Sequence, residues 1–157
     1  MQFSLSRAAQ VRAMFALLLA AVAPAVLAAE CSIEIEGRPG KRFEPQQIQV
    51  SRQCERFTVV LKHVGKNSKE EAGHNWVLTP ASELDAVIAD GLAAGVASDY
   101  LQPGDARILA HTAMLGGGER DSVSFSPRLL EAGRPYVYFC SFPPHALMMR
   151  GTLTLVD

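Results

Sequence analysis

Residues 134–156 of the chain read RPYVYFCSFPPHALMMRGTLTLV, in which two strand-like runs flank a short loop. The first run, RPYVYF, is rich in aromatic and β-branched residues, and the last, GTLTLV, alternates polar with apolar side chains, as half-buried strands do. The loop carries Cys140, His145, Met148 and Met149. A thiol, an imidazole and two thioethers are ligands that soft metal ions prefer. The stretch therefore predicts two strands joined by a candidate metal-binding loop.

Similar runs occur along the rest of the chain, separated by turn residues. Together with the two runs above, the strand candidates are residues 31–36, 46–50, 56–64, 74–78, 106–112, 121–126, 134–140 and 151–156. Eight short strands at this spacing predict an all-β protein, an eight-stranded sandwich or barrel with Greek-key connections.

One segment, residues 79–101, departs from the strand pattern and reads TPASELDAVIADGLAAGVASDYL. Leu84, Val87 and Ile88 fall on one face at helical spacing. Thr79 or Ser82 can serve as the N-cap residue of this helix. We expect one short helix, inserted between two strands and packed on the outside of the sandwich.

The first 28 residues have the features of a secretory signal peptide. Arg7 and Arg12 form a basic head, an apolar run interrupted by Pro24 follows, and small residues end at Ala28. This segment is too short and too broken to span a bilayer comfortably, and no other stretch approaches the roughly 20 apolar residues of a transmembrane helix. We expect export, cleavage after Ala28, a single domain over residues 29–157 and no membrane association afterwards.

The charge balance of the predicted mature chain gives no indication of nucleic-acid binding. Arg7 and Arg12 account for two of the 15 basic residues, which leaves 13 basic against 16 acidic residues. The chain also contains no basic run of the kind that contacts phosphate backbones.

Three cysteines are present, Cys31, Cys54 and Cys140. In an oxidising compartment two of them are expected to pair, and the third calls for an explanation. A hairpin-like return of the chain would bring Cys31 and Cys54 together, so we predict a disulfide between them. Cys140 is then the free thiol beside His145.

A trigonal site with two imidazoles and one thiolate needs a second histidine from elsewhere in the chain. The candidates are His63, His74 and His111. His74 follows Gly73, and a glycine lets the backbone come close to a metal because no Cβ intervenes.

The chain closely resembles azurins, the small blue copper proteins of the cupredoxin group. The resemblance runs from AECSIEIEG at residue 29 through GHNWVL, DGLAAGV, DYL and AHT to YFCSFPPHALMMRGTLTL. It implies the cupredoxin fold and a type 1 copper site. By this resemblance His74, Cys140 and His145 are the equatorial copper ligands, Met149 is the distant axial ligand, and the carbonyl of Gly73 is a weak contact on the opposite side.

The resemblance also implies residues that surround the ligands. The side chain of Asn75 would tie the two ligand-bearing segments together, with Ser141 as its partner, and Phe142 with Pro143 would form an apolar collar over the metal. Adjacent side chains in a strand point to opposite faces, so Met148 is expected to pack or face outward. The edge of the ligand histidine in the loop is the expected electron port.

Two departures from the family pattern bear on function. Pro144 stands where a glycine is usual, and it should stiffen the ligand loop. Residues 66–72, KNSKEEA, are charged where the family often has apolar docking residues. Outside the ligand motifs, His63 and His111 are interpreted as structural or surface residues, although His63 matches a family position sometimes linked to pH-dependent change.

The function implied by the resemblance is transport of single electrons in the periplasm by one copper ion per chain, without enzymatic activity. The expected partners are redox proteins such as c-type cytochromes or copper-containing reductases. An alternative is periplasmic copper delivery or storage. A thiol-dependent hydrolase with Cys140 as nucleophile is a third class, but no oxyanion or substrate feature favours it.

Overall fold

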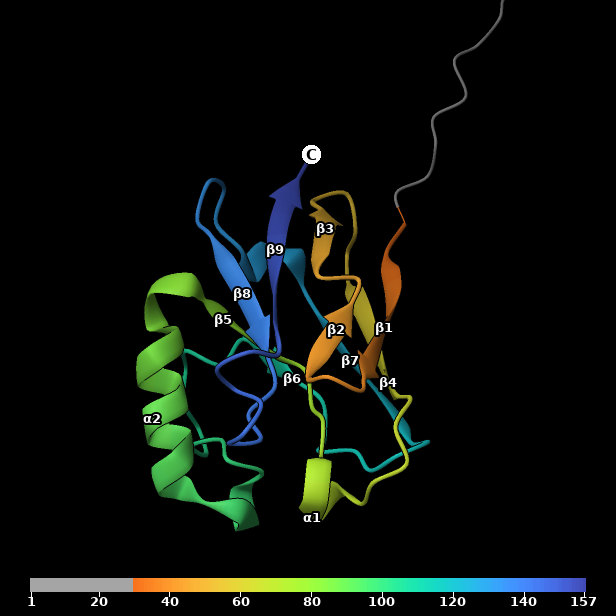
Figure 1. Ribbon diagram of the computed structural model, residues 1–157. Coiled ribbons are helices and arrows are strands. Elements are labelled where there is room, and N and C mark those ends of the chain that lie inside the picture. The colour runs from red at the N-terminus through yellow and green to blue at the C-terminus, as the bar shows by residue number, and fades with distance from the viewer. Residues whose placement is uncertain (1–29) are drawn as a thin grey trace, which may run out of the picture.

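The computed structural model describes residues 30–157, so the predicted signal peptide lies outside the described residues. Two β-sheets form a sandwich, with one helix on its outer side (Figure 1). The four-stranded sheet has the order β2-β1-β4-β7, with β1 at Ser32–Arg38, β2 at Arg42–Glu44, β4 at Phe57–His63 and β7 at Arg120–Phe125. The five-stranded sheet has the order β3-β9-β8-β5-β6, with β3 at Gln47–Ser51, β5 at Val77–Pro80, β6 at Ala110–His111, β8 at Tyr136–Phe139 and β9 at Arg150–Val156.

The predicted all-β sandwich with one short inserted helix is confirmed, with differences in detail. The described residues form nine strands, because β2 is a three-residue strand that pairs antiparallel with β1. The strand predicted at 106–112 is limited to Ala110–His111. The strand predicted at 74–78 begins at Val77, and His74 makes only an isolated bridge to Leu115.

The core lies between the sheets and follows the alternation of side chains along the strands. In β4, Phe57, Val59 and Leu61 are buried and point into the sandwich, while the residues between them are more exposed. In β8 both faces are buried: Tyr136 and Tyr138 join the core between the sheets, whereas the residues that alternate with them, Val137 and Phe139, lie in a second cluster under the helix.

The helix that covers this second face is α2, Leu84–Ala94, which lies beside β5 and β8 in Figure 1. Leu84 and Val87 pack against β5 and β8 in the second cluster, with Ile88 partly buried beside them. A Cβ at Gly91 would stand 2.1 Å from the backbone oxygen of Tyr100, so only glycine allows the helix to approach this segment so closely. The predicted helix is therefore present, in the predicted place.

The prediction for the start of this helix was wrong. A short 3₁₀ turn, Ala81–Glu83, precedes α2 and makes Glu83 the N-cap residue, without a side-chain cap hydrogen bond. Ser82 instead donates to the carboxylate of Glu83 at 3.3 Å. A second helix, α1 at Lys69–Ala72, is a single turn in the charged segment just before Gly73.

The predicted disulfide between Cys31 and Cys54 is confirmed, with Cα atoms 5.6 Å apart, and Cys140 is a buried free cysteine. The amide of Thr58 donates to the carbonyl of Cys31 at 2.9 Å, so the disulfide lies near the first residues of β4. Within residues 30–157, no helix has the length and apolar character needed to cross a membrane.

Candidate metal centre

The segment after β8 is wound into tight turns by its own backbone. His145 donates its N–H to the carbonyl of Phe142 at 2.8 Å, and Met149 donates to the carbonyl of His145 at 2.8 Å. Cys140 closes the loop, because its N–H donates to the carbonyl of Met149 at 3.1 Å. The side chains of Cys140 and His145 are thereby held on one compact loop, which Figure 1 shows at the same end of the sandwich as α1.

A second backbone segment brings His74 to this loop. The N–H of His74 donates to the carbonyl of Leu115 at 3.0 Å, and the N–H of Leu115 donates back to the carbonyl of His74 at 2.8 Å. The imidazole of His74 stacks on that of His63, with ring centroids 4.0 Å apart. His63 in turn accepts from the amide of Gly65 through Nδ1 and donates through Nε2 to the carbonyl of Ala72. These contacts hold the His63 ring in place behind the His74 ring.

His74, Cys140 and His145 converge on one point. One ligand atom from each, the two imidazole nitrogens and the sulfur, lie within 4.8 Å of one another, and all three residues are buried. The Sγ atom of Cys140 lies 3.8 Å from Nδ1 of His145. The carbonyl oxygen of Gly73 lies 3.6 Å from the same sulfur and 3.0 Å from Nδ1 of His74. Four of the five predicted copper contacts thus meet in one buried place.

The fifth predicted contact, Met149, is wholly buried, and its methyl group lies near the His74 ring. A Cβ at Gly37 would stand 2.7 Å from Cδ2 of His74 and 3.2 Å from Cε of Met149. Gly37 therefore provides the space in which these two side chains lie together, a role that no sequence motif indicates. Met148 is 59% exposed, as expected for the neighbour that faces outward.

Burial sets the protonation of the three donors. It lowers the pKa of His74 to about 3, with a further contribution from the charges of His63 and His145. It also raises the pKa of the Cys140 thiol to about 11. The pKa of His145 is lowered by burial first and by the positive charge of Lys41 second. The imidazoles are therefore neutral and ready to bind a cation, whereas the thiol needs a cation to lose its proton.

A hydrogen-bond network joins the segment that carries His74 to the loop that carries Cys140. Asn75 is fully buried; its Nδ2 donates to Oγ of Ser141 at 2.8 Å, and its Oδ1 accepts from the Ser141 amide at 2.8 Å. Ser141 Oγ donates onward to the carbonyl of Asp99 at 2.6 Å. This network fixes His74 relative to Cys140, since each ligand is the immediate neighbour of one partner.

Aromatic rings cover the loop side of the site. The ring of Phe142 lies 4.8 Å from that of His145 and meets the Tyr100 ring edge-on at 6.1 Å. Phe142 is itself only 8% exposed. The predicted apolar collar therefore also includes Tyr100, which the sequence analysis did not identify.

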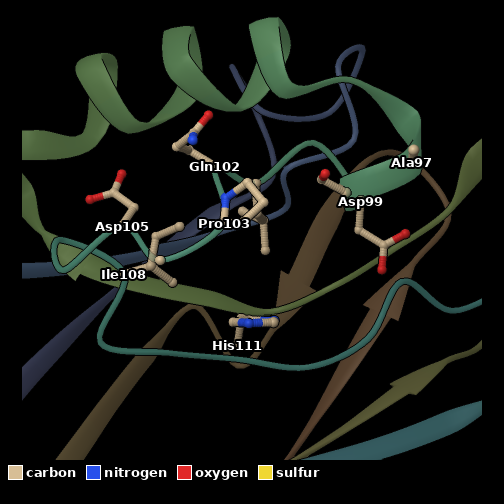
Figure 2. Close-up of a pocket in the computed structure, with 10 residues that line it drawn as sticks. Ala97, Asp99, Gln102, Pro103, Asp105, Ile108 and His111 are labelled. Atoms are coloured by element: carbon tan, nitrogen blue, oxygen red, sulfur yellow. The ribbon is translucent and has the colours of Figure 1, made fainter.

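A hollow with a volume of about 540 Å³ lies between the loop after α2 and β6 (Figure 2). Its titratable residues are Asp99, Asp105 and His111. Figure 2 shows the two carboxylates on opposite sides of the hollow, with Pro103 between them. Within residues 30–157, the one cluster of such side chains with converging ligand atoms is that of His74, Cys140 and His145.

Comparison with known proteins accounts for this cluster. A sequence model of copper binding proteins, plastocyanin/azurin family, matches residues 29–156. The chain belongs to this family. It is 53% identical to an azurin of Bordetella pertussis over 140 residues, which cover 89% of this chain and 93% of that protein. It is 50% identical to azurin-1 of Alcaligenes xylosoxydans xylosoxydans (82% and 100% covered) and 46% identical to an azurin of Pseudomonas aeruginosa (88% and 93% covered).

The donor set of the plastocyanin/azurin chain fits a copper ion. A buried thiol and two buried, neutral imidazoles meet there, and a carbonyl oxygen and a thioether lie beside them. Such a mixture of soft sulfur and imidazole ligands is typical of blue copper sites. The departure at Pro144 does not disrupt the loop, because the hydrogen bond to the Phe142 carbonyl comes from the next residue, His145.

Proposed function

We propose that the protein carries single electrons and holds one copper ion per chain. His74, Cys140 and His145 are the close ligands, Met149 is the distant axial ligand, and the Gly73 carbonyl is a weak contact. The observation that carries the proposal is the buried free thiol of Cys140, 3.8 Å from an imidazole nitrogen in a member of a copper-binding family. When bound, copper would supply the Cu(II)/Cu(I) couple.

The contribution of the chain is a preformed site. The hydrogen bonds between Asn75 and Ser141 and the closed loop from Cys140 to Met149 hold the donors in place. Side chains fixed in this way move little when the charge at the site changes, so little reorganisation accompanies each electron transfer. His145 lies at the lining of a surface groove and is the port through which an electron enters or leaves.

We further propose that the chain works in the periplasm as a single domain of residues 29–157, after removal of the signal peptide at residues 1–28. Its partners are redox proteins, such as c-type cytochromes or copper-containing reductases, and it is not an enzyme. The support is the chemistry of the site together with three relatives that are named azurin.

The experiment that tests the proposal is the visible absorption spectrum of the purified protein after addition of Cu(II). We expect an intense blue thiolate-to-copper band that is absent from a Cys140→Ser variant. Met148→Leu is the matched control, because it removes an exposed thioether from the same loop and should leave the band unchanged. A colourless wild type that nevertheless binds copper would refute the proposed site. Metal content alone does not decide the question, since zinc also accepts nitrogen and sulfur ligands.

The same preparation distinguishes electron transport from copper delivery or storage. A buried site with fixed ligands should release copper slowly to a strong chelator. Rapid loss of the blue band on addition of the chelator would favour delivery or storage instead.

A further inference from the structure

A surface groove opens beside the ligand histidines. It has a volume of about 500 Å³, and both His74 and His145 contribute to its wall. The rest of the wall comes from residues 38–41, at the end of β1 and in the turn to β2, from residues 63–67, at the end of β4 and just beyond it, and from Ala72. A molecule seated in this groove therefore comes close to the ring of His145.

The groove is cationic. Arg38, Lys41 and Lys66 line it, and its wall contains no carboxylate. Arg38 is partly neutralised by Glu36, at 2.7 Å. Lys41 and Lys66 have no carboxylate within ion-pair distance in the part of the chain that the structure describes. Lys41 and Lys66 thus share the groove wall with His145 and have no ion-pair partner among the described residues.

The backbone fixes the position of Lys41. Gly40 and Lys41 both have a positive φ, 87° and 59°, and form the tip of the turn between β1 and β2. Lys41 is half-buried there, in the wall of the groove that His145 also lines. The turn therefore fixes the backbone of Lys41 at the groove wall.

The groove differs from its neighbours in having cations and no carboxylate in its wall. The hollows beside α1 have mixed charge: one combines Lys69 with Glu70 and Asp99, and the other combines Lys66 and Lys69 with Glu70 and Glu119. The chain after residue 28 also carries more acidic than basic residues, 16 against 13 once Arg7 and Arg12 are excluded. A cationic groove on an acidic protein is a local feature and points to a ligand of opposite charge.

We propose that this groove docks a redox protein with an acidic surface around its own redox centre, with carboxylates of the partner facing Lys41 and Lys66. This inference rests on the proposed function and adds to it the charge of the partner. The apolar collar supplies close contact, and the two lysines select and orient the partner.

The first test measures the rate at which the reduced, copper-loaded protein is oxidised by hexacyanoferrate(III) and by tris(phenanthroline)cobalt(III). In each reaction one electron leaves Cu(I), giving Cu(II), and reduces Fe(III) to Fe(II) or Co(III) to Co(II). A unit charge about 10 Å from a trivalent ion changes the rate about fivefold at 0.01 M ionic strength and about twofold at 0.1 M. Lys41→Met and Lys66→Met should each slow the anionic oxidant by this factor and accelerate the cationic one.

Arg128→Met is the matched control. Arg128 is exposed and lies just after Phe125, the last residue of β7. Phe125 pairs with Phe57 at the start of β4, whereas the groove adjoins His63 at the end of β4. The control should leave both rates within about a factor of 1.5 of wild type at 0.1 M ionic strength, since the site lies beyond the screening length. If Arg128→Met alters the rates as much as the lysine variants do, only net charge matters and the proposal is wrong.

A second test does not depend on electron transfer. Hexacyanocobaltate(III), which is redox-inert and diamagnetic, is titrated into ¹⁵N-labelled metal-free protein. Amide shifts should concentrate at Gly40, Gly65 and Asn67 and should disappear in a Lys41→Met, Lys66→Met double variant. Absence of these shifts in a protein that forms the blue band overturns the docking proposal alone. Shifts in a protein that never forms the band overturn the proposed function alone.

A third test separates a protein partner from a small anion. A basic c-type cytochrome and the same cytochrome with its lysines succinylated are compared as electron donors at low ionic strength. The acidic, succinylated form should react faster with wild type, and the double lysine variant should lose this advantage. If hexacyanocobaltate(III) binds but the succinylated cytochrome reacts no faster, the groove is a small-anion site and the docking proposal is refuted.

Discussion

Replacing Asn75 with alanine should weaken both the fold and the metal centre. The change removes two hydrogen bonds of 2.8 Å in a fully buried place and leaves the Ser141 amide without its acceptor. An unsatisfied buried N–H costs about 1–3 kcal/mol, and the lost bond to the hydroxyl adds about 1 kcal/mol. We expect the free energy of unfolding to fall by about 3 kcal/mol, and the midpoint of thermal unfolding to fall by about 12 °C.

Ser141→Ala provides the partner variant for a double-mutant cycle. It removes the hydroxyl but keeps the bond from the Ser141 amide to Asn75, so it should cost about 1–2 kcal/mol. Because both variants lose the same bond between the side chains, the double variant should lose about 1 kcal/mol less than the sum. Thr58→Ala is the control, since it removes a hydrogen bond of the same 2.8 Å length, between the hydroxyls of Thr58 and Ser124, at an exposed position. It should cost less than about 0.5 kcal/mol.

The assay is urea denaturation of the metal-free protein, followed by competition for Cu(II) with a chelator. Since the network fixes the two ligand-bearing segments to each other, Asn75→Ala should lower metal affinity by about 10-fold to 100-fold. A loss of stability below about 1 kcal/mol, or an unchanged affinity, would refute the role assigned to the network.

Three further outcomes are expected. Replacing Cys31 and Cys54 with alanine opens a loop with a sequence separation of 23 and should lower the free energy of unfolding by about 3 kcal/mol in urea denaturation. Gly37→Ala places a Cβ 2.7 Å from the ring of a ligand histidine and should lower metal affinity about tenfold in the same chelator competition, with unchanged affinity counting against the close packing. Hydrogen bonds from Arg107 hold the pKa of Asp105 below its usual 3.8, so its stabilisation is present above that pH and is lost as pH falls through the lowered pKa. The stability difference between wild type and Asp105→Asn should therefore be largest near neutral pH and should vanish in acid, and a difference independent of pH would contradict this role.

The parts of the fold that were predictable from the sequence have local causes. Alternating runs such as residues 56–64 predicted β4, because one face of the strand is buried and the other is not. The helical face of Leu84, Val87 and Ile88 predicted α2 in the same way. The loop from Cys140 to Met149 was predictable because its ligand types are concentrated in a few residues.

The start of α2 shows where local reasoning fails. Thr79 and Ser82 are good N-cap residues, but Thr79 is fully buried within β5 and Ser82 lies in a 3₁₀ turn. Tertiary packing of the strand therefore decided the boundary, and the residue at the N-cap position is Glu83, which makes no cap hydrogen bond.

The surroundings of the metal centre were less predictable, because they depend on contacts between distant segments. Gly37 lies in β1 and yet limits the space around His74 and Met149. Lys41 lies in a turn that no motif marks, and its importance comes from the groove it shares with His145. Such residues become visible only when the topology places β1 beside the loop after β8.

The disulfide and the free thiol lie at opposite ends of the sandwich. Cys31 adjoins the start of β4, whereas His63 at the end of that strand stacks on His74, which meets Cys140 at the candidate metal centre. A seven-residue strand spans about 20 Å, far more than the 4.4–6.8 Å between Cα atoms that a disulfide tolerates. Once the sandwich has formed, thiol–disulfide exchange within the chain has one possible pairing. The architecture itself thereby keeps Cys140 out of any disulfide within the chain, even where the surroundings are oxidising.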